Sequence, residues 1–175
     1  YKKATGYGTV ASNDGTYVYI TGKGTGLFST GVPTPIPLVG VADAQLDTAQ
    51  QKFGSASLLL DGTGDYVQLP TTEDNGLGTT NFAIECWIRP SSVSGTQHII
   101  DFRTGSATDT APKLYLSGTT VHFGSGNTSH ASGGTVSTGT WYHIAVSRFG
   151  GVTKLFLDGT QIGSNYTCLL YTSPS

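Results

Sequence analysis

The chain is poor in the residues that long helices need. Its 175 residues include no methionine and two glutamates, and only 11% of them are charged. Amphipathic helices rely on Ala, Leu, Glu, Lys and Arg at regular spacing, so this composition disfavours a helical protein. The chain instead carries 25 glycines, 27 threonines and 17 serines among its aromatic and β-branched residues. We therefore expect an all-β protein, a sandwich or jelly roll of seven or eight short antiparallel strands.

The sequence lacks the features typical of nucleic-acid-binding and membrane-inserted proteins. The net charge is -2, and lysine and arginine are scattered singly, which argues against a nucleic-acid partner. No run of 18 apolar residues is present, which argues against membrane insertion. Residues 1–8 include no initiator methionine and no apolar core of a signal peptide. We expect an excerpt from a longer protein.

Cysteine is too scarce for a disulfide scaffold or a cysteine-based zinc site, since only Cys86 and Cys168 occur. Residues 168–175 resemble the translation of a transposase adapter used in preparing sequencing libraries. We expect this tail to be adapter read-through and the natural sequence to stop at about Thr167, before the strands that would close the sandwich.

Turn signals divide the chain into segments. Residues 1–31 contain an expected hairpin at 7–21, because an Asp-Gly pair supplies the positive φ angles of a tight turn. The prolines within 32–44 predict a linker that leads into the next domain. A short helical or irregular stretch is expected over 42–52. Residues 45–167 are expected to form an incomplete jelly roll, with strands at 57–60, 66–69, 82–89, 98–102, 113–116, 120–123, 141–148 and 153–157.

Three of these strands alternate between apolar and mixed positions, which separates an inner from an outer face. The inner positions predict the core of the sandwich: Phe82, Ile84, Ile88, Tyr142, Ile144, Val146, Leu155 and Leu157. The outer positions mix rings with charged groups and include Glu85, Trp87, Arg89 and Phe156. We expect one apolar face and one polar, aromatic face.

Four motifs resemble those of a known family. They lie at 53–67, 82–90, 141–148 and 154–159. They read FGSASLLLDGTGDYV, FAIECWIRP, WYHIAVSR and KLFLDG. In this order they resemble the laminin-G-like, concanavalin A-like lectin/glucanase family over roughly residues 45–163. The resemblance implies a jelly roll. It further implies a non-catalytic module that recognises a glycan or another surface ligand, as in adhesion proteins and phage tail or fibre proteins, at an extracellular or virion surface.

The outer face is the candidate carbohydrate site. Aromatic rings stack on the apolar faces of sugars, while carboxylates and guanidinium groups bond their hydroxyls. Trp87 between Glu85 and Arg89 has this chemistry, and Phe156 shares the face. Two alternatives stay open. The rings of Trp87 and Trp141 could simply fill space under loops, and the module could be a spacer or oligomerisation element without a ligand.

Catalytic and transition-metal signatures are weak. Glycoside hydrolysis needs two carboxylates across a cleft, and Glu73 and Glu85 are the only glutamates. No Glu-x-Asp-x-x-Glu spacing occurs, so we expect a non-enzymatic protein and consider a glycan-cleaving enzyme a lesser alternative. The histidines at 98, 122, 130 and 143 show no two-histidine metal spacing on one strand face.

Calcium is the one cofactor that the sequence suggests. Asp61 and Asp65 flank a glycine-rich turn whose carbonyls could add oxygen ligands to two carboxylates. The same pattern is also ordinary turn chemistry, in which aspartates bond their own backbone. Both interpretations remain open at this loop.

Overall fold

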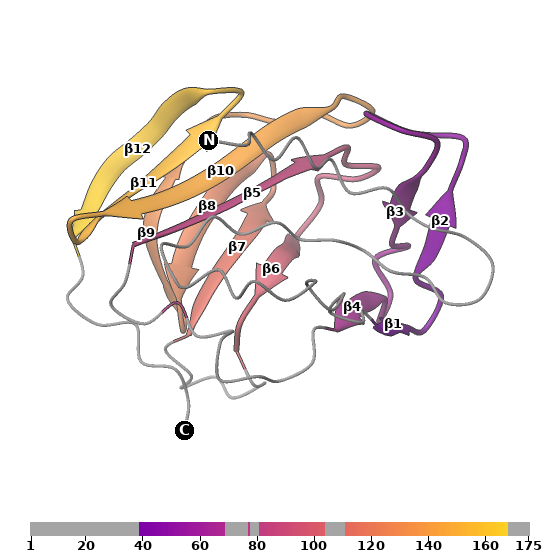
Figure 1. The fold of residues 1–175 in the computed structure, drawn as a ribbon, viewed down its shortest axis with the longest axis horizontal. Helices are drawn as coiled ribbons and strands as arrows, with labels where there is room; N and C mark the ends of the chain where they lie inside the picture. The colour runs from indigo at the N-terminus through magenta and orange to yellow at the C-terminus, as the bar shows by residue number, and fades with distance from the viewer. Residues whose placement is uncertain (1–38, 69–76, 78–80, 104–110, 168–175) are drawn as a thin grey trace, which may run out of the picture. The chain divides into compact units, whose positions relative to one another are not determined.

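A computed structural model describes residues 39–68, 77, 81–103 and 111–167, which belong to two compact units (Figure 1). The first unit comprises residues 39–68 of the described part, and the second comprises the remainder. The expected hairpin at 7–21, the prolines of 32–37 and the tail at 168–175 lie outside the described residues.

The first unit consists of two strand pairs. Strand β1 (Val39–Val41) pairs antiparallel with β4 (Tyr66–Gln68), and β2 (Gln45–Asp47) pairs antiparallel with β3 (Ser57–Leu59). The expected strands at 57–60 and 66–69 are therefore present, but they do not pair with each other. The prediction of a helical or irregular stretch over 42–52 is wrong at β2, which forms a strand within it. Its three residues are too few to show alternation, and Leu46 finds its partner Leu58 twelve positions later.

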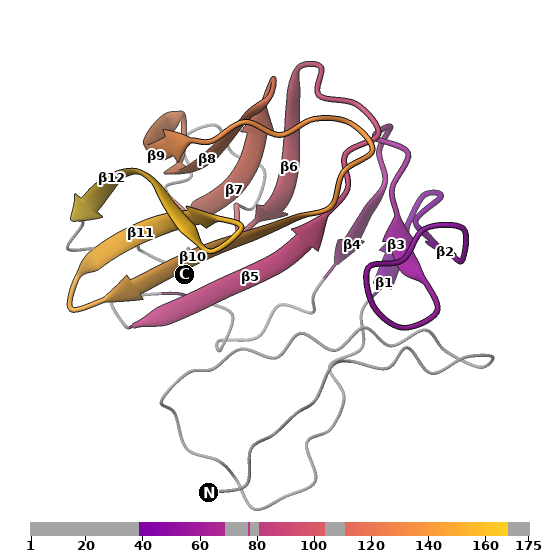
Figure 2. The same cartoon turned by 90° about the horizontal axis from the view of Figure 1, so that it is seen from above.

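The second unit is a β-sandwich of two four-stranded antiparallel sheets, which Figure 2 shows as two layers. One sheet has the order β12-β11-β10-β5, and the other has the order β6-β7-β8-β9. The strands of the first are β5 (Phe82–Ile88), β10 (Tyr142–Phe149), β11 (Val152–Leu157) and β12 (Thr160–Thr167). Those of the second are β6 (Thr96–Asp101), β7 (Pro112–Ser117), β8 (Thr120–Ser125) and β9 (Thr128–Gly133). The all-β, antiparallel prediction is confirmed, and the described residues contain no helix long and apolar enough to cross a membrane.

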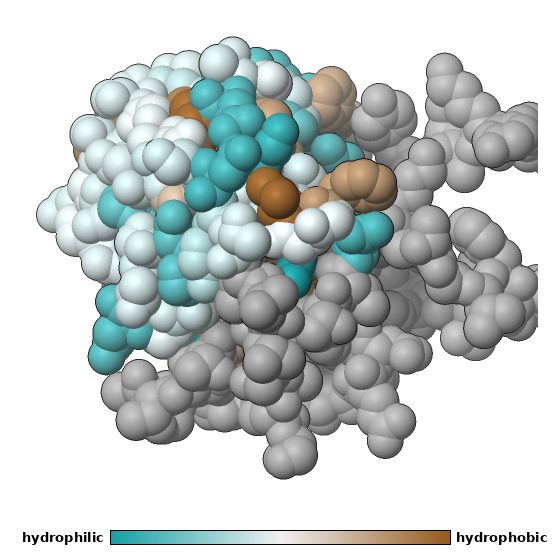
Figure 3. Space-filling view, turned by 90° about the vertical axis from the view of Figure 1, so that its left-hand side faces the viewer, coloured by the Kyte–Doolittle hydropathy of each residue, from teal (hydrophilic) through white to brown (hydrophobic). Residues whose placement is uncertain are grey.

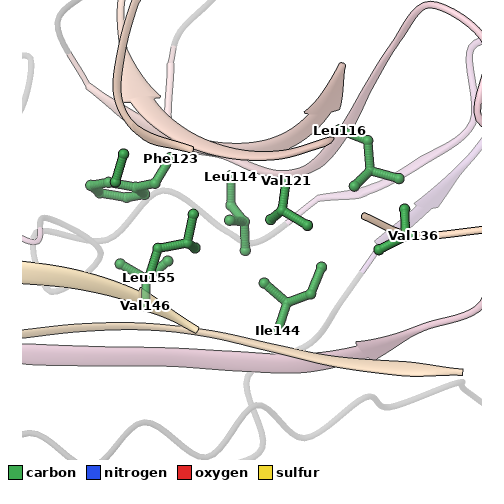
Figure 4. Packing of buried hydrophobic residues seen from close by; sticks show 9 residues of the cluster. Leu114, Leu116, Val121, Phe123, Val136, Ile144, Val146 and Leu155 are labelled. Atoms are coloured by element: carbon green, nitrogen blue, oxygen red, sulfur yellow. The ribbon is translucent and has the colours of Figure 1, made fainter. Parts of the chain in front are cut away.

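The core lies between these two sheets. Leu114, Leu116, Val121 and Phe123 point from one sheet toward Ile144, Val146 and Leu155 of the other, and Val136 closes one side (Figure 4). The half-buried side chains of Phe82, Ile88, Tyr142 and Leu157 pack against this cluster. The inner face predicted for β5, β10 and β11 is therefore correct.

Two strands of the sandwich, β9 and β12, escape prediction from the sequence because they are rich in serine, threonine and glycine. The side of the described unit where they lie is mainly hydrophilic or neutral, with small separate apolar spots (Figure 3). They approach each other closely at Gly163, whose φ is 66°. A Cβ at this position would lie 2.6 Å from the Ser132 carbonyl oxygen, so only glycine fits.

Candidate functional site

The outer face of β5 and β10 is built by alternation. In β5, Glu85 and Trp87 point away from the core because Ile84, Cys86 and Ile88 point into it. Burial raises the pKa of the Cys86 thiol to about 11, with a further contribution from the negative charge of Glu85. Trp87 keeps 38% of its surface exposed although it is one of the largest side chains of the unit.

Trp87 and Glu85 both contact His143, which lies beside them on β10. The register pairs His143 with Trp87, and the two ring centroids lie 5.2 Å apart at an interplanar angle of 44°. The Nε2 atom of His143 lies 3.4 Å from Oε2 of Glu85. We call these three residues the β5–β10 patch.

The turn after β11 fixes the position of His143. Its backbone N–H donates to Oδ1 of Asp158 at 2.8 Å, and the N–H of Asp158 donates to the His143 carbonyl oxygen at 2.8 Å. Asp158 holds a positive φ of 49°, in the Asp-Gly turn that joins β11 and β12. The patch is therefore attached to regular strands and a tight turn, which favours a preformed surface.

Phe156 extends the same face across a small residue. The register places Ala145 of β10 between Glu85 and Phe156, and the methyl group of Ala145 is the shortest side chain of that row. Arg89 follows the last residue of β5, in the segment where the Pro90 carbonyl oxygen accepts a hydrogen bond from Gly139 N–H at 2.8 Å. Of the four residues predicted for the site, Glu85 and Trp87 share His143, Phe156 lies across Ala145, and Arg89 lies at the end of the strand.

His143 is the residue that sequence reasoning missed in this patch. Alternation within 141–148 placed it on the outer face but gave it no partner. Its contacts depend on the register between β5 and β10, which are more than 50 residues apart in the chain, and no local signal reports that register.

The aspartates proposed for calcium bond the backbone of their own unit. Asp65 accepts the N–H groups of Asp43 and Asp61, each at 2.8 Å, and Asp61 accepts the N–H of Thr63 at 2.6 Å. The hydrogen bonds from Asp61 and Asp43 hold the pKa of Asp65 below its ordinary value. This is the turn chemistry that the sequence left open, and the described residues contain no group of three or more ligating His, Cys, Asp or Glu side chains. Calcium at Asp61 and Asp65 stays a prediction.

The outer face of the second sheet carries a row of three rings that sequence reasoning also missed. His98 of β6, Tyr115 of β7 and His122 of β8 occupy neighbouring register positions. The Tyr115 and His122 centroids lie 5.0 Å apart at 16°, and those of His98 and Tyr115 lie 5.8 Å apart at 36°. Burial lowers the pKa of both His98 and His122, so their rings favour the neutral form. We call these residues the ring row.

A comparison with protein families agrees with the all-β sandwich fold. Residues 61–171, more than half of the chain, match the Laminin_G_3 family, which is described as the concanavalin A-like lectin/glucanases superfamily. No curated protein and no solved structure matches the chain. On the family match and the two-sheet antiparallel fold, the chain belongs to the laminin-G-like family of the concanavalin A-like lectin/glucanase superfamily.

Proposed function

We propose that the chain is a non-catalytic carbohydrate-binding module and that the β5–β10 patch, with Ala145 and Phe156, contacts the sugar. The observation that carries the proposal is the exposed Trp87 ring held against His143 beside the Glu85 carboxylate. An indole covers the C–H face of a pyranose, and a carboxylate accepts hydrogen bonds from its hydroxyls. The superfamily to which the chain belongs includes lectins by name.

The shape of the row supports the same surface. The short Ala145 side chain lies between the larger Glu85 and Phe156, so it leaves a low position flanked by a carboxylate and a ring. A sugar ring at that position would reach an apolar face on one side and an acceptor on the other. Arg89, at the end of β5, is a further donor for the same ligand.

The exposure of Glu85 supports binding in preference to hydrolysis. A glycosidase holds its acid in a cleft, across from a second carboxylate. The Glu85 side chain is 69% exposed, so it is not enclosed in this way. We place the module in a larger adhesion protein at an extracellular or virion surface, such as a phage tail or fibre.

A glycan array probed with the 175-residue chain tests this proposal. We expect binding to a restricted set of glycans, with a loss of about tenfold or more in Trp87→Ala and a comparable loss in Ala145→Gln, which fills the low position. Phe149→Ala is the matched control, because it removes another exposed ring from β10 and should leave binding unchanged. Absence of binding to any glycan, or equal binding by the Trp87 variant, would overturn the proposal and favour a spacer without a ligand.

A further inference from the structure

A buried lysine lies next to the ring row on the outer face of the second sheet. Lys113 precedes Tyr115 by two positions on β7, so both side chains leave the same face. Only 8% of Lys113 is exposed, and its Nζ atom lies 4.8 Å from the centroid of the Tyr115 ring. A charge this deeply buried is costly unless an opposite charge offsets it.

The carboxylate that the strand register places nearest to Lys113 already binds other groups. Asp101 of β6 pairs with Lys113 in the ladder, but its carboxylate binds Arg103 in a bidentate pair at 2.6 and 2.9 Å and lies 3.3 Å from Nδ1 of His98. Burial would raise the pKa of Asp101, but the hydrogen bonds and charge of Arg103 outweigh it and lower that pKa. Within the described ranges, no carboxylate lies within 4.0 Å of the Lys113 ammonium group. This face therefore has a surplus of positive charge at Lys113.

The β8 side of Lys113 carries no side chain. Its register partner there is Gly124, where a Cβ would collide with the Thr128 carbonyl oxygen. Two residue pairs further along, on the same face, His122 binds Ser129 Oγ through Nδ1 at 2.9 Å, which directs its Nε2 atom away from that bond. Neutral imidazole and phenol groups beside a cation can bond the oxygens of an anion without adding charge.

The curvature of the sheet brings these groups together. In Figure 4 the ribbon that carries Leu114 and Val121 bows toward the core. Side chains on the opposite, outer surface of such a ribbon converge. Lys113 and Tyr115 belong to that outer surface, since Leu114 and Leu116 alternate with them into the core.

We propose that Lys113, together with Tyr115 and His122, binds an oxyanion group, a carboxylate or sulfate, carried by a glycan ligand. The oxyanion supplies the negative charge that offsets the Lys113 ammonium group. Tyr115 and His122, on adjacent strands, supply hydrogen bonds to it. This second surface lies on the sheet opposite the β5–β10 patch. It rests on the proposed function only in taking the ligand to be a glycan.

Isothermal titration of the 175-residue chain with matched oligosaccharides tests the inference. The probes are a galacturonate trimer, a sulfated galactose trimer, an unmodified galactose trimer, and sodium acetate and sodium sulfate alone. We expect one or both acidic trimers to bind more tightly than the unmodified trimer by about tenfold or more, as a charge-assisted bond implies. Preference for the galacturonate trimer assigns a carboxylate, and preference for the sulfated trimer assigns a sulfate.

Two lysine variants test whether the preference for acidic trimers arises at Lys113. Lys113→Met keeps most of the length of the side chain but removes its charge, and it should abolish the preference for the acidic trimers. Lys154→Met removes a lysine from the outer face of the other sheet and should leave the preference intact. Equal affinity for acidic and unmodified trimers, an unchanged preference in Lys113→Met, or binding of the simple salts with no preference among trimers would overturn the inference. Trp87→Ala separates the two proposals, because it should weaken binding at the β5–β10 patch without changing the acidic preference.

Discussion

Replacement of Ile144 by alanine should strongly destabilise the sandwich. Ile144 is fully buried in β10, between Cys86 of β5 and Leu157 of β11. The substitution removes three carbons, which corresponds to ~2.4 kcal/mol of lost transfer free energy at ~0.8 kcal/mol per methylene. The cavity that remains adds to this loss. We therefore expect the free energy of unfolding to fall by about 3 to 4 kcal/mol.

Urea denaturation measures this loss. At an m-value of about 2 kcal/mol/M, a loss of 3 kcal/mol lowers the midpoint by about 1.5 M. Phe149 provides the control, because this larger side chain belongs to the same strand but is 79% exposed. Phe149→Ala should cost no more than about 0.5 kcal/mol.

The comparison remains informative if the alanine variant does not fold. Ile144→Val removes one methylene and should cost about 0.5 to 1.5 kcal/mol, still more than the Phe149 variant. A larger loss in Phe149→Ala than in both Ile144 variants would refute the assignment of inner and outer faces, and the β5–β10 patch would lose its basis.

Three further predictions concern the turns and the polar groups. In a thermal melt, Gly163→Ala should destabilise the sandwich by about 1–2 kcal/mol or more, because the φ of Gly163 is positive and Ser132 blocks a Cβ. Gly150→Asn, at a positive φ in open space, should be nearly neutral. Equal effects of the two substitutions would contradict the close approach of β9 and β12. Burial lowers the pKa of His130 below its ordinary 6.5, so the unfolded state binds more protons than the folded state and the free energy of unfolding should fall as the pH drops below 6.5. His130→Gln should reduce this fall. An unchanged pH profile in the variant would contradict the prediction. Calcium bound to Asp61 and Asp65 should raise the melting temperature relative to a chelated sample, and an Asp61→Asn variant should lose the shift; identical melts at millimolar Ca²⁺ would retire the calcium site.

Local patterns in the sequence predict the strands whose side chains alternate. The inner and outer residues of β5 are correctly separated because one face of the strand is buried and the period of a strand is two. The polar strands β9 and β12 are missed because serine and threonine give no contrast between faces. Strand β2 is missed because three residues cannot establish a period.

The contacts that make up both candidate surfaces depend on the register between strands far apart in the chain. His143 meets Trp87, and Tyr115 meets His98, only once the sheets have formed. The aspartates of the glycine-rich turn show a different limit, since their sequence fits both a calcium site and backbone capping. The structure displays the capping bonds.

The most direct test of the account is an NMR titration that observes the two tryptophan indole N–H signals while a glycan selected on the array is added. The chain contains two tryptophans, so Trp141 serves as an internal control for Trp87, and a Trp87→Phe variant assigns the signals. We predict that the Trp87 signal shifts with the concentration dependence of binding, while the Trp141 signal stays in place. Saturable glycan binding that moves only the Trp141 signal, or neither signal, would contradict the placement of the sugar at the β5–β10 patch.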